Sequence, residues 1–149
     1  MVKNKGFNLI ELLIVVVVVA VLAAIAYPSY VEYQRKANRV EAQAELLDIA
    51  KKLQRYKVAN LSYRNGVTFV TLANIGETVP LNVPRQGTAY YRINLTGVTN
   101  NTWLLQAQPI NNTIQQLDGA LALNHRGEKC WGKGLAACQP SATTNWDGN

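Results

Sequence analysis

One carboxylate is unusual because of the residues that surround it. Glu11 lies within residues 7–27, a 21-residue stretch in which only Asn8 and Glu11 are not apolar. An ionised carboxylate in such a segment costs about 2.5–3.5 kcal/mol on membrane-insertion scales, so it calls for a cationic partner. No Lys or Arg lies between residues 7 and 33. The partner is therefore expected from another molecule, or from an α-amino group created by cleavage of the chain.

A cut between Gly6 and Phe7 would create such an amine. It would remove Lys3 and Lys5 and place a positive charge four residues before Glu11. Since an intramembrane carboxylate normally pairs with a cation, we expect head-to-tail packing of neighbouring helices. In this packing, the amine of one subunit meets Glu11 of the next.

The same residues resemble the class III signal of type IV pilins and pseudopilins. A Lys-containing leader precedes Gly6-Phe7-Asn8-Leu9-Ile10-Glu11, an apolar run follows, and Pro28 stands at the family's kink position. The resemblance implies cleavage after Gly6 by a prepilin peptidase, N-methylation of Phe7 and a role for Glu11 in assembly. Two positions depart from the family pattern, because Asn8 replaces the usual Thr and Ala20 replaces a frequent Gly.

Residues 7–27 have the length of a membrane-spanning helix. Lys3 and Lys5, with no acidic residue beside them, predict a cytoplasmic N-terminus and an extracytoplasmic remainder. Two plainer interpretations stay open. One is a secretory signal peptide cut after Ala24-Ile25-Ala26, which would release a soluble domain starting at Tyr27, and the other is a simple single-span anchor.

The pattern predicts an α+β fold. A long kinked N-terminal helix, transmembrane in its first half, is expected to pack on a small antiparallel β-sheet meander with a C-terminal disulfide loop. Pro28 predicts a kink rather than an end, because no Gly or Pro interrupts residues 30–57. The apolar stripe predicted for the second half of this helix comprises Tyr33, Ala37, Val40, Ala44 and Leu47, and then Ile49, Leu53 and Tyr56.

The predicted parts follow one another along the chain. A cleaved leader at residues 1–6 precedes a hydrophobic helix at 7–29 and an extracytoplasmic head at 30–149. The head comprises an amphipathic helix at 30–57, an irregular loop at 58–87, a sheet at 88–132 and a disulfide region at 130–138. The predicted strands are 89–95, 102–108, 120–124 and the short 128–131.

The two cysteines predict a disulfide. Cys130 and Cys138 would pair in an oxidising compartment and close a loop worth about 2–3 kcal/mol. His125 could join them as a zinc ligand, but the seven residues between the cysteines do not match the short spacing of structural zinc sites. We therefore expect a turn histidine beside a disulfide, and no metal site.

Basic residues around this loop suggest a second kind of chemistry. Arg126, Lys129, Trp131 and Lys133 place three cations and one aromatic ring within eight residues. This combination could attract phosphates and stack on bases, so it is a candidate DNA contact. The alternative is that the charges solvate an exposed loop while Trp131 caps the sheet.

Composition excludes a large multidomain enzyme, since the chain has only 149 residues. Its 15 basic and 9 acidic residues give a charge of +6, which becomes +4 (13 against 9) after loss of the leader. A single histidine and the absence of a phosphate-binding loop or paired-carboxylate pattern predict no enzyme activity and no cofactor.

The resemblance implies a structural subunit of a type IV pilus, more like a minor than a major pilin. Such a subunit sits in the inner membrane as a prepilin, among its lipids. It is processed by prepilin peptidase and polymerised with other major and minor pilins by the inner-membrane assembly machinery. The filament, extracellular or periplasmic, would serve motility, adhesion or DNA uptake. The alternatives are a DNA-binding pilin of natural transformation and a type II secretion pseudopilin.

Overall fold

The computed structural model describes residues 8–147. The chain divides into two compact units, Met1–Gln34 and Arg35–Asn149. Helix α1 (Leu9–Asn60) makes up the first unit apart from residues 1–8 and continues into the second, which also contains all the strands. The predicted processing site, Gly6 and Phe7, lies outside the described residues.

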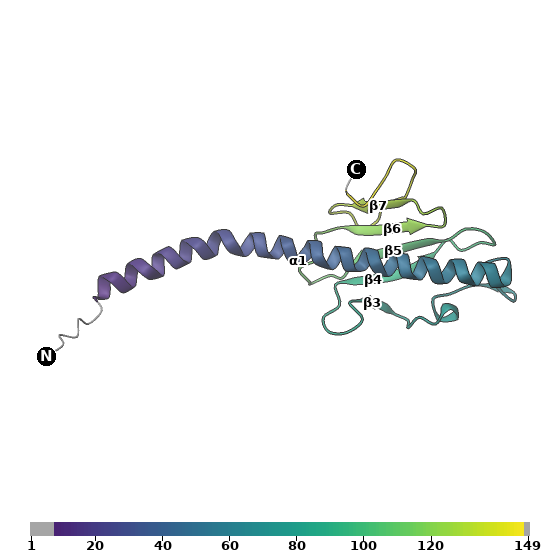
Figure 1. The fold of residues 1–149 in the computed structure, drawn as a ribbon, viewed down its shortest axis with the longest axis horizontal. Coiled ribbons are helices and arrows are strands. Elements are labelled where there is room, and N and C mark those ends of the chain that lie inside the picture. The colour runs from purple at the N-terminus through teal and green to yellow at the C-terminus, as the bar shows by residue number, and fades with distance from the viewer. Residues whose placement is uncertain (1–7, 148–149) are drawn as a thin grey trace. The chain divides into compact units, whose positions relative to one another are not determined.

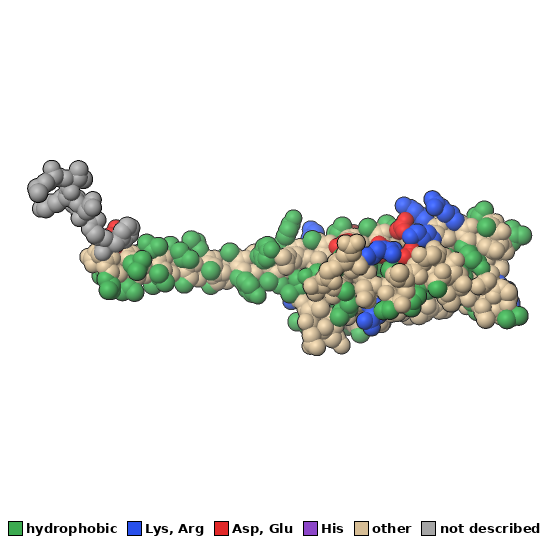
Figure 2. All heavy atoms as spheres, turned by 90° about the horizontal axis from the view of Figure 1, so that it is seen from below, with side chains coloured by type: hydrophobic (Ala, Val, Ile, Leu, Met, Phe, Trp, Pro, Cys, Tyr) green, Lys and Arg blue, Asp and Glu red, His purple; other side chains and the backbone are tan. Residues whose placement is uncertain are grey.

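The first half of α1 is apolar on every side. It begins after Asn8, whose carbonyl accepts hydrogen bonds from the N–H groups of Glu11 and Leu12 at 3.1 and 3.2 Å. Its large hydrophobic side chains are all at least half exposed. Figure 2 shows hydrophobic side chains along this part of the helix. Within the described chain, α1 is the one helix long and apolar enough to cross a membrane. An all-round apolar surface of this kind needs lipid or other helices to cover it.

Pro28 lies inside α1, and the helix continues through it. Proline lacks the N–H that would bond to the carbonyl four residues earlier, so one backbone bond is lost there. Ser29 Oγ donates to the carbonyl of Ile25 at 3.4 Å, next to this gap. The helix ends at Asn60. The next residue, Leu61, takes a left-handed φ of 59°, and the side-chain amide of Asn60 donates to the Tyr56 carbonyl at 2.9 Å.

The head of the protein, by which we mean the unit Arg35–Asn149, contains one main sheet. Its five strands follow the chain in the order β3-β4-β5-β6-β7, each antiparallel to the next, and a separate hairpin joins β1 and β2 (Figure 1). This confirms the predicted α+β fold with an antiparallel meander. The elements are β1 (Arg64–Asn65), β2 (Thr68–Phe69), the short 3-10 helix η1 (Ala73–Ile75), β3 (Leu81–Val83), β4 (Tyr91–Thr96), β5 (Leu104–Pro109), β6 (Ala120–Asn124) and β7 (Lys129–Gly132).

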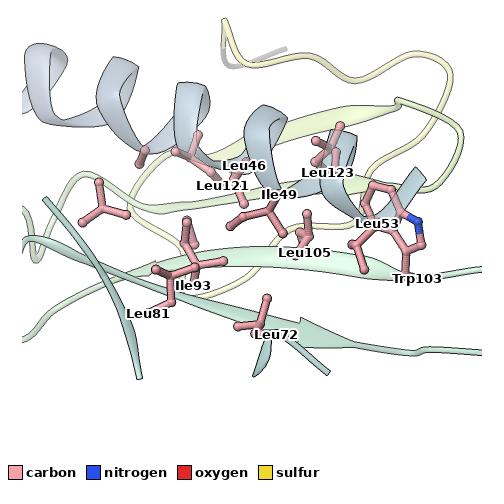
Figure 3. Packing of buried hydrophobic residues seen from close by; sticks show 14 of the residues in the cluster. Leu46, Ile49, Leu53, Leu72, Leu81, Ile93, Trp103, Leu105, Leu121 and Leu123 are labelled. Atoms are coloured by element: carbon pink, nitrogen blue, oxygen red, sulfur yellow. The ribbon is translucent and has the colours of Figure 1, made fainter. Parts of the chain in front are cut away.

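The second half of α1 covers one face of this sheet, and the core lies between them. Leu46, Ile49 and Leu53 of α1 are fully buried. They face buried side chains of the central strands, and Trp103 lies beside Leu53 at the end of this row (Figure 3). Alternation along the strands places these residues on the face toward α1: Leu81, Tyr91, Ile93, Leu105, Ala107, Leu121 and Leu123.

One strand lies where an irregular loop was predicted. β3 falls within residues 58–87 and pairs with β4 through Leu81 opposite Ile93. Pro80 and Pro84 flank these three residues. Because proline is typical of turns, so short a strand between two prolines is not recognisable in the sequence. The sheet therefore begins before residue 88, at an edge where proline is tolerated because the outer N–H groups have no partner strand.

The predicted apolar stripe of α1 is wrong in its first part. Tyr33, Val40 and Leu47 are 72%, 54% and 38% exposed. The buried face instead continues backwards from Leu53 in helical steps, as far as a charged residue, Arg39. Because the charge of Arg39 is neutralised inside the head, hydrophobicity alone could not identify this face. The members of the buried face are Arg39, Ala42, Leu46, Ile49, Ala50 and Leu53.

Candidate functional sites

Glu11 lies in the first turn of α1. A carboxylate there interacts favourably with the helix dipole, which explains its tolerance in part. Within residues 8–147, however, Glu11 makes no hydrogen bond or ion pair with another side chain. The partner expected from the sequence, an α-amino group or another molecule, lies outside the described residues.

A buried ion pair fixes α1 to the segment before β6. Arg39 donates from Nε and Nη2 to the two carboxylate oxygens of Asp118 at 2.8 and 2.6 Å. The two side chains are 11% and 3% exposed. A two-point guanidinium–carboxylate pair fixes orientation as well as distance, so it defines how α1 sits on the sheet within the head.

Three neutral groups complete this pair. The Tyr91 hydroxyl donates to Asp118 Oδ2 at 2.6 Å and accepts from Gln115 Nε2 at 3.0 Å. Burial, and then the nearby Asp118 carboxylate, raise the pKa of Tyr91 well above its usual range, so the phenol stays protonated and remains a donor. The Arg39 guanidinium lies 3.5 Å from the centroid of the Trp131 ring. The result is a closed polar cluster rather than an open site.

A second charge network joins α1 to the loop around β3. Glu77, only 6% exposed, accepts from Lys52 at 2.5 Å and from Arg85 at 2.7 Å. Arg85 also bonds to Glu45, and Lys52 pairs with Asp48 at 2.8 Å, four residues earlier on α1. Figure 2 shows acidic and basic side chains side by side on the head.

This network is not a metal site. Carboxylate oxygens of Glu45, Asp48 and Glu77 lie within 4.8 Å of one another. Lys52 and Arg85, however, already bind these three carboxylates. Burial acts to raise the pKa of Glu77, but the hydrogen bonds from Lys52 and Arg85 outweigh it and lower the pKa. Two cations thus bind all three carboxylates, and these contacts attach the loop to α1.

The disulfide forms as the sequence predicts, between Cys130 and Cys138, with Cα atoms 6.1 Å apart. It holds the chain after β7 against the sheet. The Leu135 carbonyl accepts from the Ala120 N–H at 2.8 Å, and the Asn145 carbonyl accepts from the Trp131 N–H at 3.0 Å. The C-terminal segment thus covers the β6–β7 side of the sheet.

The four residues proposed for DNA contact have different surroundings. Arg126 pairs with Glu128 at 3.0 Å, at the exposed turn between β6 and β7. Lys129 is half-buried, and its ammonium lies 4.9 Å from the centroid of the Trp146 ring. Lys133 is exposed and makes no hydrogen bond or ion pair within residues 8–147. Lys129 and Lys133 therefore keep their charges unpaired by carboxylates.

The Trp131 side chain is held by two contacts within the head. Arg39 covers a face of its ring, and its Nε1 donates to the Asp118 carbonyl at 2.8 Å. Arg39 therefore occupies one face of a ring that is partly exposed, and the two contacts give Trp131 a structural role in the head. Sequence reasoning missed Arg39 and Asp118, although a charge in the apolar register of a helix, three residues before Ala42, is a signal for a buried pair.

Cavities mark two faces of the head. One, of about 300 Å³, lies between α1 and the β6–β7 turn and is lined in part by Lys51, Trp103 and Lys129. Trp103 Nε1 is the one buried side-chain polar atom in the described chain without a hydrogen-bond partner. Two others, of about 490 and 370 Å³, share Gln108 in their linings, and the larger one also reaches the core-facing Leu81 and Ile93.

Comparison with known proteins gives the family. A family described as "Prokaryotic N-terminal methylation motif" matches residues 1–27. A family described as "Type IV minor pilin ComP, DNA uptake sequence receptor" matches residues 28–120. Among solved structures, the non-core minor pilin PilV of Neisseria meningitidis is similar at 17% identity and a TM-score of 0.49, over 76% of this chain and 98% of that one. No curated protein matches the chain.

The two family matches are contiguous and together reach from residue 1 to the start of β6. The ComP match alone spans more than half of the chain, and so the protein belongs to the ComP family of type IV minor pilins.

Proposed function

We propose that this minor pilin is made as an inner-membrane prepilin, which a prepilin peptidase cuts between Gly6 and Phe7 and methylates at Phe7. The match of residues 1–27 to the N-terminal methylation motif supports this proposal. The positively charged leader, with Lys3 and Lys5, favours a cytoplasmic N-terminus. The head then faces the periplasm before assembly and the filament surface, outside the cell, afterwards.

Assembly is proposed to depend on Glu11. Its carboxylate is without a partner in the described chain and lies in an apolar helix that needs cover. Lipid of the inner membrane supplies that cover before assembly, and neighbouring helices supply it in the filament. The partners are major and minor pilins, brought together by the inner-membrane assembly machinery, and the amine of a neighbour's Phe7 neutralises Glu11.

The function we assign to the head is binding of extracellular DNA for uptake. The observation that carries this proposal is the match of residues 28–120 to a family described as a DNA uptake sequence receptor. A net charge of +4 after removal of the leader, 13 basic against 9 acidic residues, favours binding to a polyanion. Lys129 and Lys133 are the proposed phosphate contacts, because no carboxylate neutralises them.

The test is DNA binding by the full-length processed protein in an uncharged detergent. Binding of a labelled duplex is measured by fluorescence anisotropy between 50 and 200 mM salt. Each phosphate contact contributes about 0.9 to the slope of log affinity against log salt, so Lys129→Ala with Lys133→Ala should lower that slope by about 1.8. Lys36→Ala, which removes an exposed cation of α1, is the matched control and should leave the slope nearly unchanged.

Absence of duplex binding by the wild-type protein, even at 50 mM salt, would refute the receptor function. Binding with an unchanged slope in the double variant would keep the function and reject Lys129 and Lys133 as its contacts.

A further inference from the structure

Three of the seven tyrosines of the chain lie close together in the first unit, within residues 27–33. Tyr27, Tyr30 and Tyr33 are all more than half exposed. Each residue of an α-helix turns the direction of its side chain by about 100°, so a spacing of three places these rings within about one third of the helix circumference. They form an exposed aromatic surface on α1, which we call the tyrosine patch.

The tyrosine patch begins where the apolar part of α1 ends. Residues 12–26 are all apolar, and no charged residue lies between Glu11 and Glu32. From Leu9, the first residue of α1, to Ala26 the helix rises by about 26 Å at 1.5 Å per residue. The hydrocarbon core of a bilayer is about 30 Å thick. A span that starts at the N-terminal end of α1 therefore reaches the far boundary of the hydrocarbon close to Tyr27.

Tyrosine suits this boundary chemically. Its ring is apolar and its hydroxyl is polar, and it is therefore enriched at membrane–water interfaces. The Tyr30 hydroxyl accepts a hydrogen bond from Gln34 Nε2 at 2.6 Å. Gln34 lies one turn further along α1, so the hydroxyl has a polar partner beyond the end of the apolar segment. A ring with such a contact can keep its apolar part toward the hydrocarbon and its polar end toward water.

Two neighbouring residues fit the same boundary. Pro28 lies inside α1 and cannot donate to the carbonyl of Ala24, four residues earlier. An unpaired carbonyl is costly in hydrocarbon, but water and headgroups can reach it at the interface. Glu32 lies on the side of the helix opposite Tyr30, because two residues turn by about 200°. The apolar segment therefore ends at the tyrosine patch in its backbone as well as in its side chains.

These observations favour the lipid interface over a second helix as the partner of the patch. Helices that pack together in membranes usually do so through small residues, which let their backbones approach closely. Three large rings on one face keep a neighbouring helix at a distance. We propose that Tyr27, Tyr30 and Tyr33 lie among the headgroups of the periplasmic leaflet and set the depth of α1 in the inner membrane before assembly. This inference rests on the proposed inner-membrane prepilin.

The experiment measures the depth of one helix position in a bilayer. The full-length processed protein, with a nitroxide attached to Ala23→Cys, is reconstituted in vesicles of phosphatidylethanolamine and phosphatidylglycerol. Ala23 is exposed and lies one turn before Tyr27. Cys130 and Cys138 are paired in the disulfide, so only the introduced cysteine reacts. Electron paramagnetic resonance then gives the depth from the accessibility of the nitroxide to oxygen and to a water-soluble nickel complex.

Two triple variants change the tyrosine patch in different ways. The leucine variant, Tyr27→Leu with Tyr30→Leu and Tyr33→Leu, lengthens the apolar surface of the helix and removes the three hydroxyls. We expect its nitroxide to lie about 5 Å closer to the bilayer centre, a shift of about one helical turn. The tryptophan variant, with Trp at the same three positions, is the matched control. It should keep the wild-type depth, because tryptophan also prefers the interface.

Three results would overturn the inference. An unchanged depth in the leucine variant would do so while leaving the membrane location intact. An equal shift in the tryptophan variant would show that amphipathic rings do not set the depth. Loss of the leucine variant from filaments, with its nitroxide at the wild-type depth, would identify the patch as a contact between subunits instead. A nitroxide exposed to water in the otherwise unchanged protein would reject the underlying inner-membrane prepilin.

Discussion

Arg39 holds its charge inside the head because a single carboxylate accepts hydrogen bonds from two of its nitrogens. Asp118 accepts two hydrogen bonds from it, and the Trp131 ring lies against the same guanidinium. Removing one partner of such a pair leaves the other charge buried and uncompensated, which costs far more than the pair contributes in balance. The cluster therefore fixes geometry more than it adds stability.

Arg39→Met is expected to lower the free energy of unfolding by about 3–5 kcal/mol, because Asp118 loses its cation. The double variant Arg39→Met with Asp118→Asn should recover part of this loss, since no buried charge remains. Urea denaturation of the four proteins of this cycle provides the measurement. A single variant as stable as the wild type would show that Asp118 is solvated by other means.

Glu77 makes stability depend on acid. Its pKa in the folded protein is lower than the ordinary value of 4.5, so its contribution is complete above that pH and is lost as pH falls below it. Glu77→Gln should destabilise the protein by about 1–2 kcal/mol at pH 7, because charged hydrogen bonds are lost. The difference from wild type should shrink toward pH 3 in thermal unfolding. Glu41→Gln, an exposed glutamate on α1, should show no such trend.

Among the elements, strands with ordinary alternation were predictable from the sequence. Contacts between residues that are far apart in the sequence were not. The predicted segments 89–95, 102–108 and 120–124 correspond to β4, β5 and β6, because each alternates or is bounded by turn residues. β3 was missed between its prolines. The buried face of α1 was predicted wrongly because it includes the charged Arg39, whose partner lies 79 residues away in the sequence. No local pattern encodes a contact of that kind.

The candidate sites show the same limit. Spacing in the sequence suggested Lys129, Trp131 and Lys133 as one basic cluster, whereas their contacts differ, because Arg39 lies over the Trp131 ring and Lys129 lies over the Trp146 ring. Conversely, Arg39, Tyr91 and Asp118 lie far apart in the sequence. Only the fold brings the Tyr91 hydroxyl to 2.6 Å from Asp118 Oδ2. Sites assembled across strands need the fold before they can be recognised.

The turn that precedes β6 depends on one glycine. Gly119 has a φ of +100°, and a Cβ atom built on it would lie 1.9 Å from the Gly132 carbonyl oxygen. We expect Gly119→Ala to cost more than 2 kcal/mol, because backbone strain and a backbone clash add up. Gly97→Ala is a suitable comparison, since Gly97 also has a positive φ but its nearest contact is 3.9 Å away. Its cost should be only about 1 kcal/mol in the same denaturation assay.

At the scale of the whole molecule, the chain combines two units with different solvent requirements. The apolar half of α1 needs lipid or neighbouring helices, and the head carries its own core. This division is what a filament subunit requires, because the same helix must leave the membrane and enter a bundle. In the function proposed above, the carboxylate of Glu11, in the first turn of α1, directs that exchange.

Glu11→Ala is expected to leave the protein processed and membrane-inserted but to reduce its incorporation into filaments at least tenfold, because the amine of the neighbour loses its counter-charge. Immunoblotting of sheared filaments and of membranes measures the two pools. Intact mass should show the same methylated Phe7 start in variant and wild type. Normal incorporation would contradict the proposed role of Glu11, and a chain starting at Tyr27 would contradict the pilin-type processing.

The hydrogen bonds between Arg35 and residues 114–115, at the beginning of the head, also determine how the subunit resists pulling. Arg35 Nε donates to the Ile114 carbonyl at 2.6 Å, and Gln115 Nε2 donates back to the Arg35 carbonyl at 3.1 Å, one turn before the Arg39–Asp118 pair. A pulling force applied to the N-terminal side of α1 therefore acts first on these hydrogen bonds and on the Arg39–Asp118 ion pair. The apolar core around Leu46, Ile49 and Leu53 lies further along the helix and is loaded only after them. When the subunit is pulled by the first half of α1, these polar contacts would thus be sheared before the apolar core is strained.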